Sequence, residues 1–309
     1  MLGVRYHVAS LAAVFLALAV GILLGVAISG KLSDAEESLQ QEKIRDLEQD
    51  LSNARSSADS AQERGAAAER LVEDAYPALM ENRLEGRRVG VIFLGPVDRS
   101  VLSAVERTLT DADGARPART IGLDVPVDPA DLQDTLAGDE QLATYANDEG
   151  DFGDLGRELG RELVLGGDTV LWNALQSTLV EERSGALSDE VDAVVIRYSW
   201  TAPALGDSDS GEEAASVRST SSLLEGIVGG LGSFGVPVVG VAGTDDPRAL
   251  VELYRDQGVS SVDDVDTVAG RLALAVLLAD GEPGHYGLED SASDGVVPPI
   301  EPVQQQPGG

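Results

Sequence analysis

Cysteine is absent from the 309-residue sequence, and histidine and methionine are scarce, with two of each. Without cysteine the chain can form no disulfide bond, no thiolate zinc site, no iron–sulfur cluster and no cysteine nucleophile. So few imidazole and thioether groups leave little material for a soft-metal site, which needs several such ligands. The sequence also has no Walker A lysine and no GxSxG or HExxH motif. We therefore expect neither an enzyme nor a bound cofactor.

Basic residues are outnumbered, with 22 lysines and arginines against 54 aspartates and glutamates, which gives a formal net charge of -32. A field of this sign repels nucleic-acid phosphates, so we expect no nucleic-acid partner. Hydrophobic residues make up 43 % of the chain, which is enough for a folded domain.

Residues 8–29 form a 22-residue run with no charged side chain. At about 1.5 Å per residue, a helix of this length spans roughly 33 Å, close to the bilayer core of about 30 Å. We therefore predict one transmembrane anchor in the cell membrane, with 1–7 as a cytoplasmic tail and an extracytoplasmic body. Cleavage as a signal peptide remains the alternative. Gly21 and Gly25 form a GxxxG pair, which suits close packing of two anchors.

Residues 30–84 are typical of a coiled-coil stalk, because small and apolar residues recur there at alternating spacings of three and four. These seam positions are Ile44, Leu47, Leu51, Ala54, Ala58, Ala61, Gly65, Ala68, Val72, Ala75 and Leu79. Alanine and glycine bury little area, so the seam needs a partner to be stable. A parallel homodimer is the prediction that we favour. A spacer without a partner, and a docking surface for a helix of another envelope protein, remain open.

From residue 85 to 288 the pattern changes to apolar runs that alternate with amphipathic segments. The strand-like segments are 89–94, 120–123, 191–198, 236–242 and 259–262, and the helix-like segments are 100–110, 129–182, 216–231, 246–257 and 267–279. This alternation predicts an α/β domain with a Rossmann-like parallel sheet flanked by helices. Residues 289–309 are rich in Asp, Ser, Pro and Gln, which predicts a disordered tail.

Two features of the body invite a functional interpretation. Gly230, Gly232 and Gly235 fit GxGxxG, but they close a helix and precede a strand, so they predict a helix end and turn and not a dinucleotide loop. His285 lies in the segment GEPGHYG just after the last helix, and it is the body's one histidine. A metal site needs several ligands, so His285 is only a weak metal candidate. Asp266 precedes the last helix and can cap it.

Three stretches of the sequence resemble the mycobacterial copper transport protein B (MctB) family. They are the start of the anchor from His7 to Gly21, the segment before the last helix that contains Asp263, Asp264 and Asp266, and the closing motif Gly284, His285, Tyr286 and Gly287. The order of anchor, coiled coil and α/β body is also similar.

The resemblance implies a role in copper transport or homeostasis, with copper as the metal that such a protein handles. An alternative is a coiled-coil scaffold without catalysis of its own, which regulates cell separation by activating a peptidoglycan hydrolase. Copper sites favour Cys, Met and His, of which this chain has few, so the residues themselves fit the scaffold better.

Overall fold

The computed structural model describes residues 3–301 apart from 114–116, 147–149, 168, 188, 204–210 and 247–248. The chain divides into two compact units, Met1–Ala68 and Glu69–Gly309. The first unit is helical, and the second contains the α/β body.

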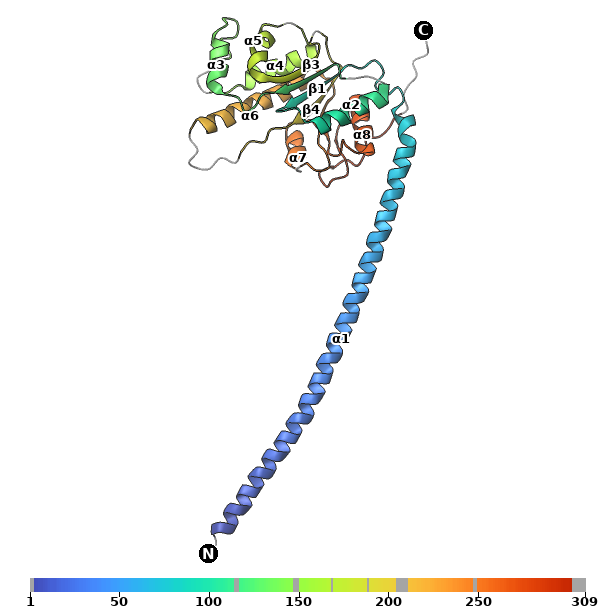
Figure 1. Ribbon diagram of the computed structural model, residues 1–309, viewed down its shortest axis with the longest axis vertical. Helices are drawn as coiled ribbons and strands as arrows, with labels where there is room; N and C mark the ends of the chain where they lie inside the picture. Colours follow the sequence, from blue (N-terminus) through green and yellow to red (C-terminus); the bar gives the residue numbers. More distant parts are fainter. Residues whose placement is uncertain are drawn as a thin grey trace. The chain divides into compact units, whose positions relative to one another are not determined.

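One helix, α1 (Gly3–Met80), contains the predicted anchor and the predicted stalk as far as Met80, four residues short of the predicted end at 84 (Figure 1). Pro77 lies inside the helix, which continues to Met80. Large apolar side chains between Leu11 and Leu24 are exposed. Among the residues that the structure describes, no helix combines the length and the apolar character that crossing a bilayer requires. The transmembrane anchor at 8–29 is therefore not confirmed and stays a prediction.

The predicted seam lies on this helix, but its pairing is not tested. Ile44, Leu47 and Leu51 are 54 %, 67 % and 50 % exposed, and nothing within the first unit covers them. Leu79, at the other end of the seam, packs instead on the core of the second unit. In the anchor, an added Cβ on Gly21 would meet no atom within 4 Å, and Gly25 lies outside the residues whose surroundings are described.

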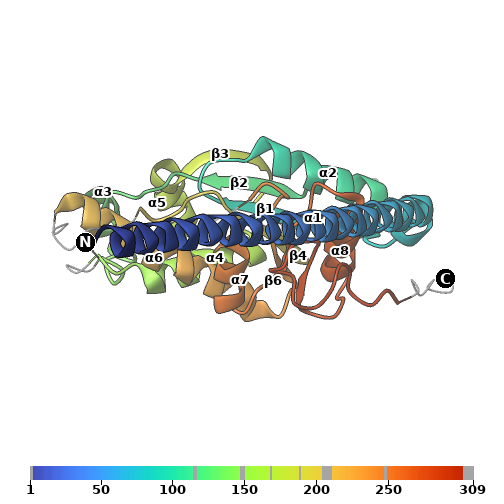
Figure 2. The same cartoon turned by 90° about the horizontal axis from the view of Figure 1, so that it is seen from below.

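The second unit is built on a seven-stranded sheet with the order β3-β2-β1-β4-β5-β6-β7. Figure 2 labels β3, β2, β1, β4 and β6, which follow one another in this order. The strands are β1 (Val89–Leu94), β2 (Arg119–Leu123), β3 (Val180–Gly185), β4 (Ala193–Tyr198), β5 (Val238–Val241), β6 (Ser260–Val262) and β7 (His285–Tyr286). All neighbouring pairs are parallel except β2 and β3. A mostly parallel sheet flanked by helices confirms the predicted α/β class. The antiparallel edge strand β3 was not predicted.

Helices cover both faces of this sheet (Figure 1). Side chains alternate along the strands, so Ile92 and Leu94 of β1 face one core, whereas Val91 and Phe93 face the other. The first core is closed by α3 (Pro129–Ala137), α4 (Gly153–Leu165), α5 (Val170–Leu179), α6 (Glu212–Leu231) and α7 (Ala249–Asp256). The second is closed by α2 (Arg99–Asp113), α8 (Val268–Leu278) and the last turn of α1.

Glycines bring α4 and α6 into backbone contact. A Cβ added to Gly160 would lie 2.2 Å from the carbonyl oxygen of Ile227, and one added to Gly230 would lie 2.1 Å from that of Arg157. The GxGxxG string therefore serves packing and chain reversal. The helix ends at Leu231, a 3-10 turn follows, and Gly235 takes a left-handed conformation with φ 70° before β5. This confirms the helix end and turn that we predicted.

Residues 289–301, for which composition predicts disorder, are held against the body. Ser291 donates from its hydroxyl to Asp263 at 2.9 Å and accepts from Arg255 at its carbonyl at 2.7 Å. The backbone N–H of Asp294 donates to the carbonyl of His285. Polar residues whose composition predicts a disordered tail thus form specific hydrogen bonds with the body. Residues 302–309 lie outside the described residues.

Candidate functional site

The order of the parallel strands identifies where a ligand site is expected. In space they run β2-β1-β4-β5-β6, so the chain builds outward from β1 to β2 and then returns to add β4 on the other side. In open α/β sheets, ligands bind at the carboxyl ends of the strands beside such a switch point. Here the switch point lies between β1 and β4.

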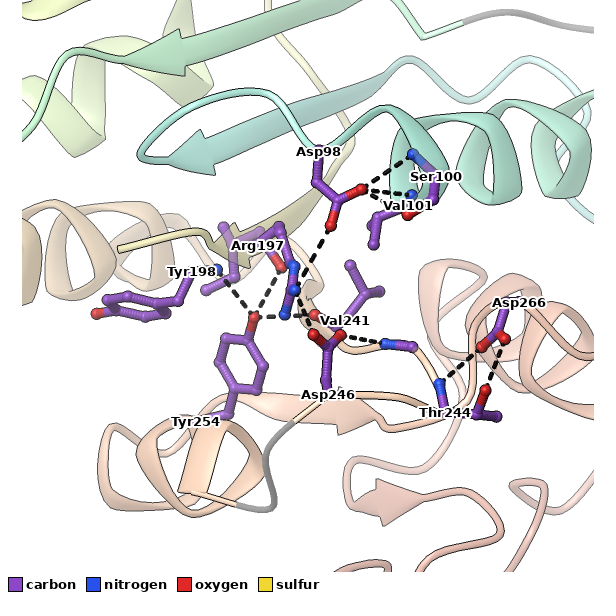
Figure 3. A network of polar contacts seen from close by, with 12 residues as sticks. Asp98, Ser100, Val101, Arg197, Tyr198, Val241, Thr244, Asp246, Tyr254 and Asp266 are labelled. Atoms are coloured by element: carbon purple, nitrogen blue, oxygen red, sulfur yellow. Dashed lines mark hydrogen bonds and ion pairs between the residues drawn. The ribbon is translucent and has the colours of Figure 1, made fainter. Parts of the chain in front are cut away.

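A network of charges occupies this position (Figure 3). Arg197, near the end of β4, donates from Nη2 to Oδ1 of Asp246 at 2.7 Å and lies 3.6 Å from Oδ2 of Asp98. The Arg197 side chain is only 8 % exposed. Asp98 follows β1 and Asp246 follows β5, so three neighbouring strands each contribute one charged residue. Two carboxylates more than balance the one buried guanidinium.

Asp98 also caps the N-terminus of α2. Its Oδ1 accepts from the backbone N–H of Ser100 at 2.9 Å and of Val101 at 3.2 Å. Burial alone would raise the pKa of Asp98, but these hydrogen bonds and the charge of Arg197 hold the pKa below its usual value. The first turn of this helix is where a Rossmann-type protein holds a phosphate. Because the protein's own carboxylate fills that position, the arrangement does not favour a nucleotide.

Tyr254 and Asp266 extend the network on either side. The buried Tyr254 hydroxyl accepts from the N–H of Tyr198 at 3.2 Å and reaches the carbonyl of Val241 at 3.1 Å, and burial raises its pKa to about 12. Asp266 accepts from the backbone N–H and the hydroxyl of Thr244 at 2.9 and 2.8 Å. The prediction that Asp266 caps α8 is therefore wrong. Thr267 caps this helix, because its hydroxyl accepts from the N–H of Gly270.

The two predicted family segments meet at the edge of the sheet, because β6 pairs with β7. Asp263 donates from its backbone N–H to the carbonyl of Tyr286 at 3.2 Å, and its Oδ1 accepts from the N–H of Leu288 at 3.1 Å. The Tyr286 hydroxyl donates to the carbonyl of Glu282. Gly284 sits where a Cβ would be 2.9 Å from the Tyr286 ring. Through these contacts, Asp263 and residues 284–291 hold the chain after β6 against the closing motif, and we call this group of residues the clasp.

Asp264 is fully buried beside this clasp, and its Oδ1 has no hydrogen-bond partner among the described residues. Its other oxygen accepts from the Thr267 hydroxyl at 3.0 Å. Burial, with the neighbouring charges of Asp263 and Asp266, raises the pKa of Asp264 to about 7. A Cβ on Gly270 would lie 2.0 Å from the Asp264 carbonyl, so α8 starts in close contact with this residue.

His285, the weak metal candidate, lies within the clasp and contacts Ser261 and Asp294. Its Nδ1 lies 3.0 Å from the hydroxyl of Ser261, and its backbone N–H donates to Asp294 at 2.8 Å. Burial and the charge of Arg255 lower the pKa of His285, which favours the neutral imidazole. Across the described ranges, no three side chains of His, Cys, Asp or Glu come together as a metal would require. Met80 is fully buried in the core, so its thioether is not offered to a metal either.

The sequence thus singled out Asp263 and the closing motif as family motifs, but the charged network at the switch point was not predicted. Asp263 and the closing motif are brought together, whereas Asp264 bonds to Thr267 and Asp266 bonds to Thr244. The seam positions lie on α1. The available signal was Arg197, a basic residue within an otherwise apolar strand, since a buried arginine needs carboxylate partners.

Comparison with known proteins finds relatives over nearly the whole chain. A family model described as "Copper transport outer membrane protein, MctB" matches residues 1–298. The protein called "Copper transporter MctB" of Mycobacterium bovis is 29 % identical over 317 residues, which cover 93 % of this chain and 96 % of the relative. Proteins of the same name from two strains of Mycobacterium tuberculosis match to the same extent. The chain therefore belongs to the MctB family of copper transport outer membrane proteins.

Proposed function

We propose that this protein takes part in copper transport or homeostasis at the cell envelope. The observation that carries the proposal is the family match over residues 1–298, which spans the helix, the α/β body and the clasp. The names of the matched family and relatives concern copper transport, and none of them concerns cell separation, so we favour the copper role over the scaffold.

The ligands of the body limit how copper, as the transported substrate, meets the chain. Copper sites favour thiolate, thioether and imidazole groups. The described residues offer His285 but no accessible thioether or thiolate. We therefore propose weak contact of copper at His285 or contact through an envelope partner, with no resident copper cofactor and no catalytic step.

We further propose that residues 8–29 anchor the protein in the cell membrane, with the body on the extracytoplasmic side. The support is the uncharged 22-residue run itself, within one continuous helix. Apolar side chains such as Phe15 and Leu23 are 63 % and 71 % exposed, so they are available to lipid or to a second anchor. Carbonate extraction of membranes tests this proposal: the protein should stay in the pellet, and release into the wash would contradict an integral anchor.

The stalk is proposed to form a parallel homodimer in register. With Ile44 and Leu51 at a positions and Leu47 at a d position, the flanking g and e positions carry complementary charges. Lys43 at g would face Glu48 at e of the second copy, and Asp50 at g would face Arg55 at e. The exposure of the apolar seam between them supports the same arrangement.

Copper sensitivity of a deletion strain tests the proposed function. We expect the deletion to lower growth at raised copper, and the intact chain to restore it. Unchanged growth across a copper series would contradict the proposal. Calorimetric titration of the full chain in detergent with Cu(I) and Cu(II) then distinguishes direct contact of copper at His285 from contact through an envelope partner. Binding that is lost in His285→Ala but kept in Asp290→Asn supports direct contact, and no binding supports contact through a partner.

A further inference from the structure

A cavity of about 510 Å³ opens beside the charged network, at the carboxyl end of β4. Its lining includes Arg197 and Asp246 of the network together with Trp200, Glu225, Leu250 and Leu253. The volume lies within the range of about 300–1,000 Å³ typical of small-molecule sites. The cavity also stands next to the switch point between β1 and β4, where ligands of open α/β sheets bind.

Polar groups without partners lie at this place. Nε and Nη1 of Arg197 are buried and have no hydrogen-bond partner among the described residues, and the same holds for Oγ of Ser199. Nη2 of Arg197 is engaged by Asp98 and Asp246, and the guanidinium also interacts with the hydroxyl of Tyr254. Buried polar groups in folded proteins are nearly always hydrogen-bonded, and each unmet group costs free energy. Donors at a cavity wall therefore point to a ligand that brings an acceptor oxygen.

Much of the remaining wall is apolar, although Thr201, Ser221 and Gln257 also line the cavity. Leu224 of α6 and Leu250 and Leu253 of α7 line the cavity, and Trp200 follows β4. The Tyr198 ring, which also lines the cavity, packs on Tyr254 with their centroids 5.8 Å apart. Such a wall favours an aliphatic or aromatic side chain on the ligand, since apolar area is removed from water on binding.

The charges decide between ligand classes. Asp98 and Asp246 already balance Arg197, and Glu225 adds a further carboxylate to the lining, so a simple anion would meet net negative charge. The start of α2, which could have held a phosphate, is closed by Asp98. A ligand with an acceptor oxygen for Arg197 and an ammonium group for Glu225 meets both demands.

We propose that this cavity binds an apolar zwitterion, of the class of short peptides with aliphatic side chains. The ligand carboxylate would accept from Arg197 and Ser199, its ammonium group would lie at Glu225, and its side chain would contact Leu250, Leu253 and Trp200. This site is separate from the copper role and does not depend on it.

The two tryptophans of the chain allow a direct test. Trp172 is buried in α5, away from the cavity lining, so the variant Trp172→Phe leaves Trp200 as the single fluorescent reporter. The full chain of this variant, in detergent, is titrated with leucyl-leucine. We expect a saturable change in Trp200 emission at millimolar or lower concentration.

Ligand and protein variants then test each contact. N-acetyl-leucyl-leucine lacks the ammonium group and glycyl-glycine lacks the apolar side chains, so each should bind at least about tenfold more weakly. Glu225→Gln should weaken leucyl-leucine binding about tenfold, whereas Glu252→Gln, an exposed residue of α7 outside the lining, should not. Arg197→Lys keeps the charge beside Asp98 and Asp246 but removes the spare donors, so it should weaken binding similarly in a chain that circular dichroism shows to be folded.

Two results would overturn the proposal. One is the absence of any saturable emission change with leucyl-leucine in the folded Trp172→Phe chain. The other is binding that neither N-acetylation nor Glu225→Gln alters, or that inorganic phosphate reproduces, because the cavity would then not select a zwitterion.

Discussion

A Cβ atom placed on Gly287 would lie 1.6 Å from Oδ1 of Asp263. The carboxylate is fixed there, because Asp263 accepts from Leu288 and Ser291 and is itself buried. Gly287 also has φ 150°, a conformation that L side chains rarely adopt. The closing motif and the segment before α8 are therefore coupled by direct contact.

The variant Gly287→Ala should destabilise the body by about 3 kcal/mol or more, because a clash is added to backbone strain. Gly295→Ala is a matched control, since Gly295 has φ 113° but an added Cβ would meet nothing within 4 Å. It should lose only about 1 kcal/mol. Urea denaturation followed by circular dichroism measures both changes. Equal losses in the two variants would contradict a specific contact with Asp263.

The backbone contact between α4 and α6 predicts that one added methyl group in this contact lowers the stability of the body. In Gly160→Ala the new methyl group would meet the carbonyl of Ile227, which is backbone and cannot rotate away. We expect a loss of about 2–4 kcal/mol as the helices separate. Gly229→Ala on the same α6 meets nothing within 4 Å and should be neutral, or stabilising by up to about 1 kcal/mol. Thermal unfolding of both variants provides the comparison.

The sequence predicts the central strands well because their burial leaves a continuous apolar pattern. Residues 89–94 and 236–242 were assigned as strands, and β1 and β5 lie within them. The edge strand β3 was missed because VEERSG is largely exposed and carries no such pattern. Secondary structure that buries little area leaves little trace in hydrophobic periodicity.

The candidate site was predictable only in part. Asp263 and the closing motif were singled out together, yet the reason that they meet, which is the pairing of β6 with β7, depends on tertiary structure. Arg197 and Asp98 lie about a hundred residues apart, and only the order of the strands brings them together. No local pattern in either segment indicates this pairing.

The buried carboxyl of Asp264 predicts a dependence of stability on pH. Its pKa is about 7 in the folded protein, against an ordinary value of 3.8. Between these values the folded state binds more protons than the unfolded state, so stability falls as pH rises from about 4 to about 7 and then levels off. The upper bound for this loss is about 4 kcal/mol. Because Asp264→Asn cannot ionise, it should become more stable relative to the natural chain as pH rises.

Urea denaturation of both chains at pH 5, 6, 7 and 8 measures this difference. Asp266→Asn serves as the control, since it removes a neighbouring carboxylate and leaves Asp264 able to ionise. A constant difference between Asp264→Asn and the natural chain across this range would show that Asp264 does not titrate there.

The absence of cysteine makes the proposed parallel dimer open to site-specific crosslinking. Ala54→Cys places the only thiol at a d position of the seam, where two copies in register would bring their Cβ atoms close enough for a disulfide. Ser56→Cys places it at the outward f position and should not crosslink. The full chain in detergent is oxidised and the fraction of covalent dimer is read from a non-reducing gel. Equal crosslinking at both positions would contradict the predicted seam.

Charge reversal in the Ala54→Cys background tests the orientation of the two helices. Asp50→Arg would face Arg55 of the second copy in a parallel dimer, and Arg55→Asp would face Asp50, so each single change replaces attraction by repulsion at two symmetric places. Either should weaken dimerisation about tenfold. The double variant restores opposite charges and should recover the crosslink. Because net charge is the same in the double variant and the natural chain, failure to recover would exclude the parallel register that pairs Asp50 with Arg55.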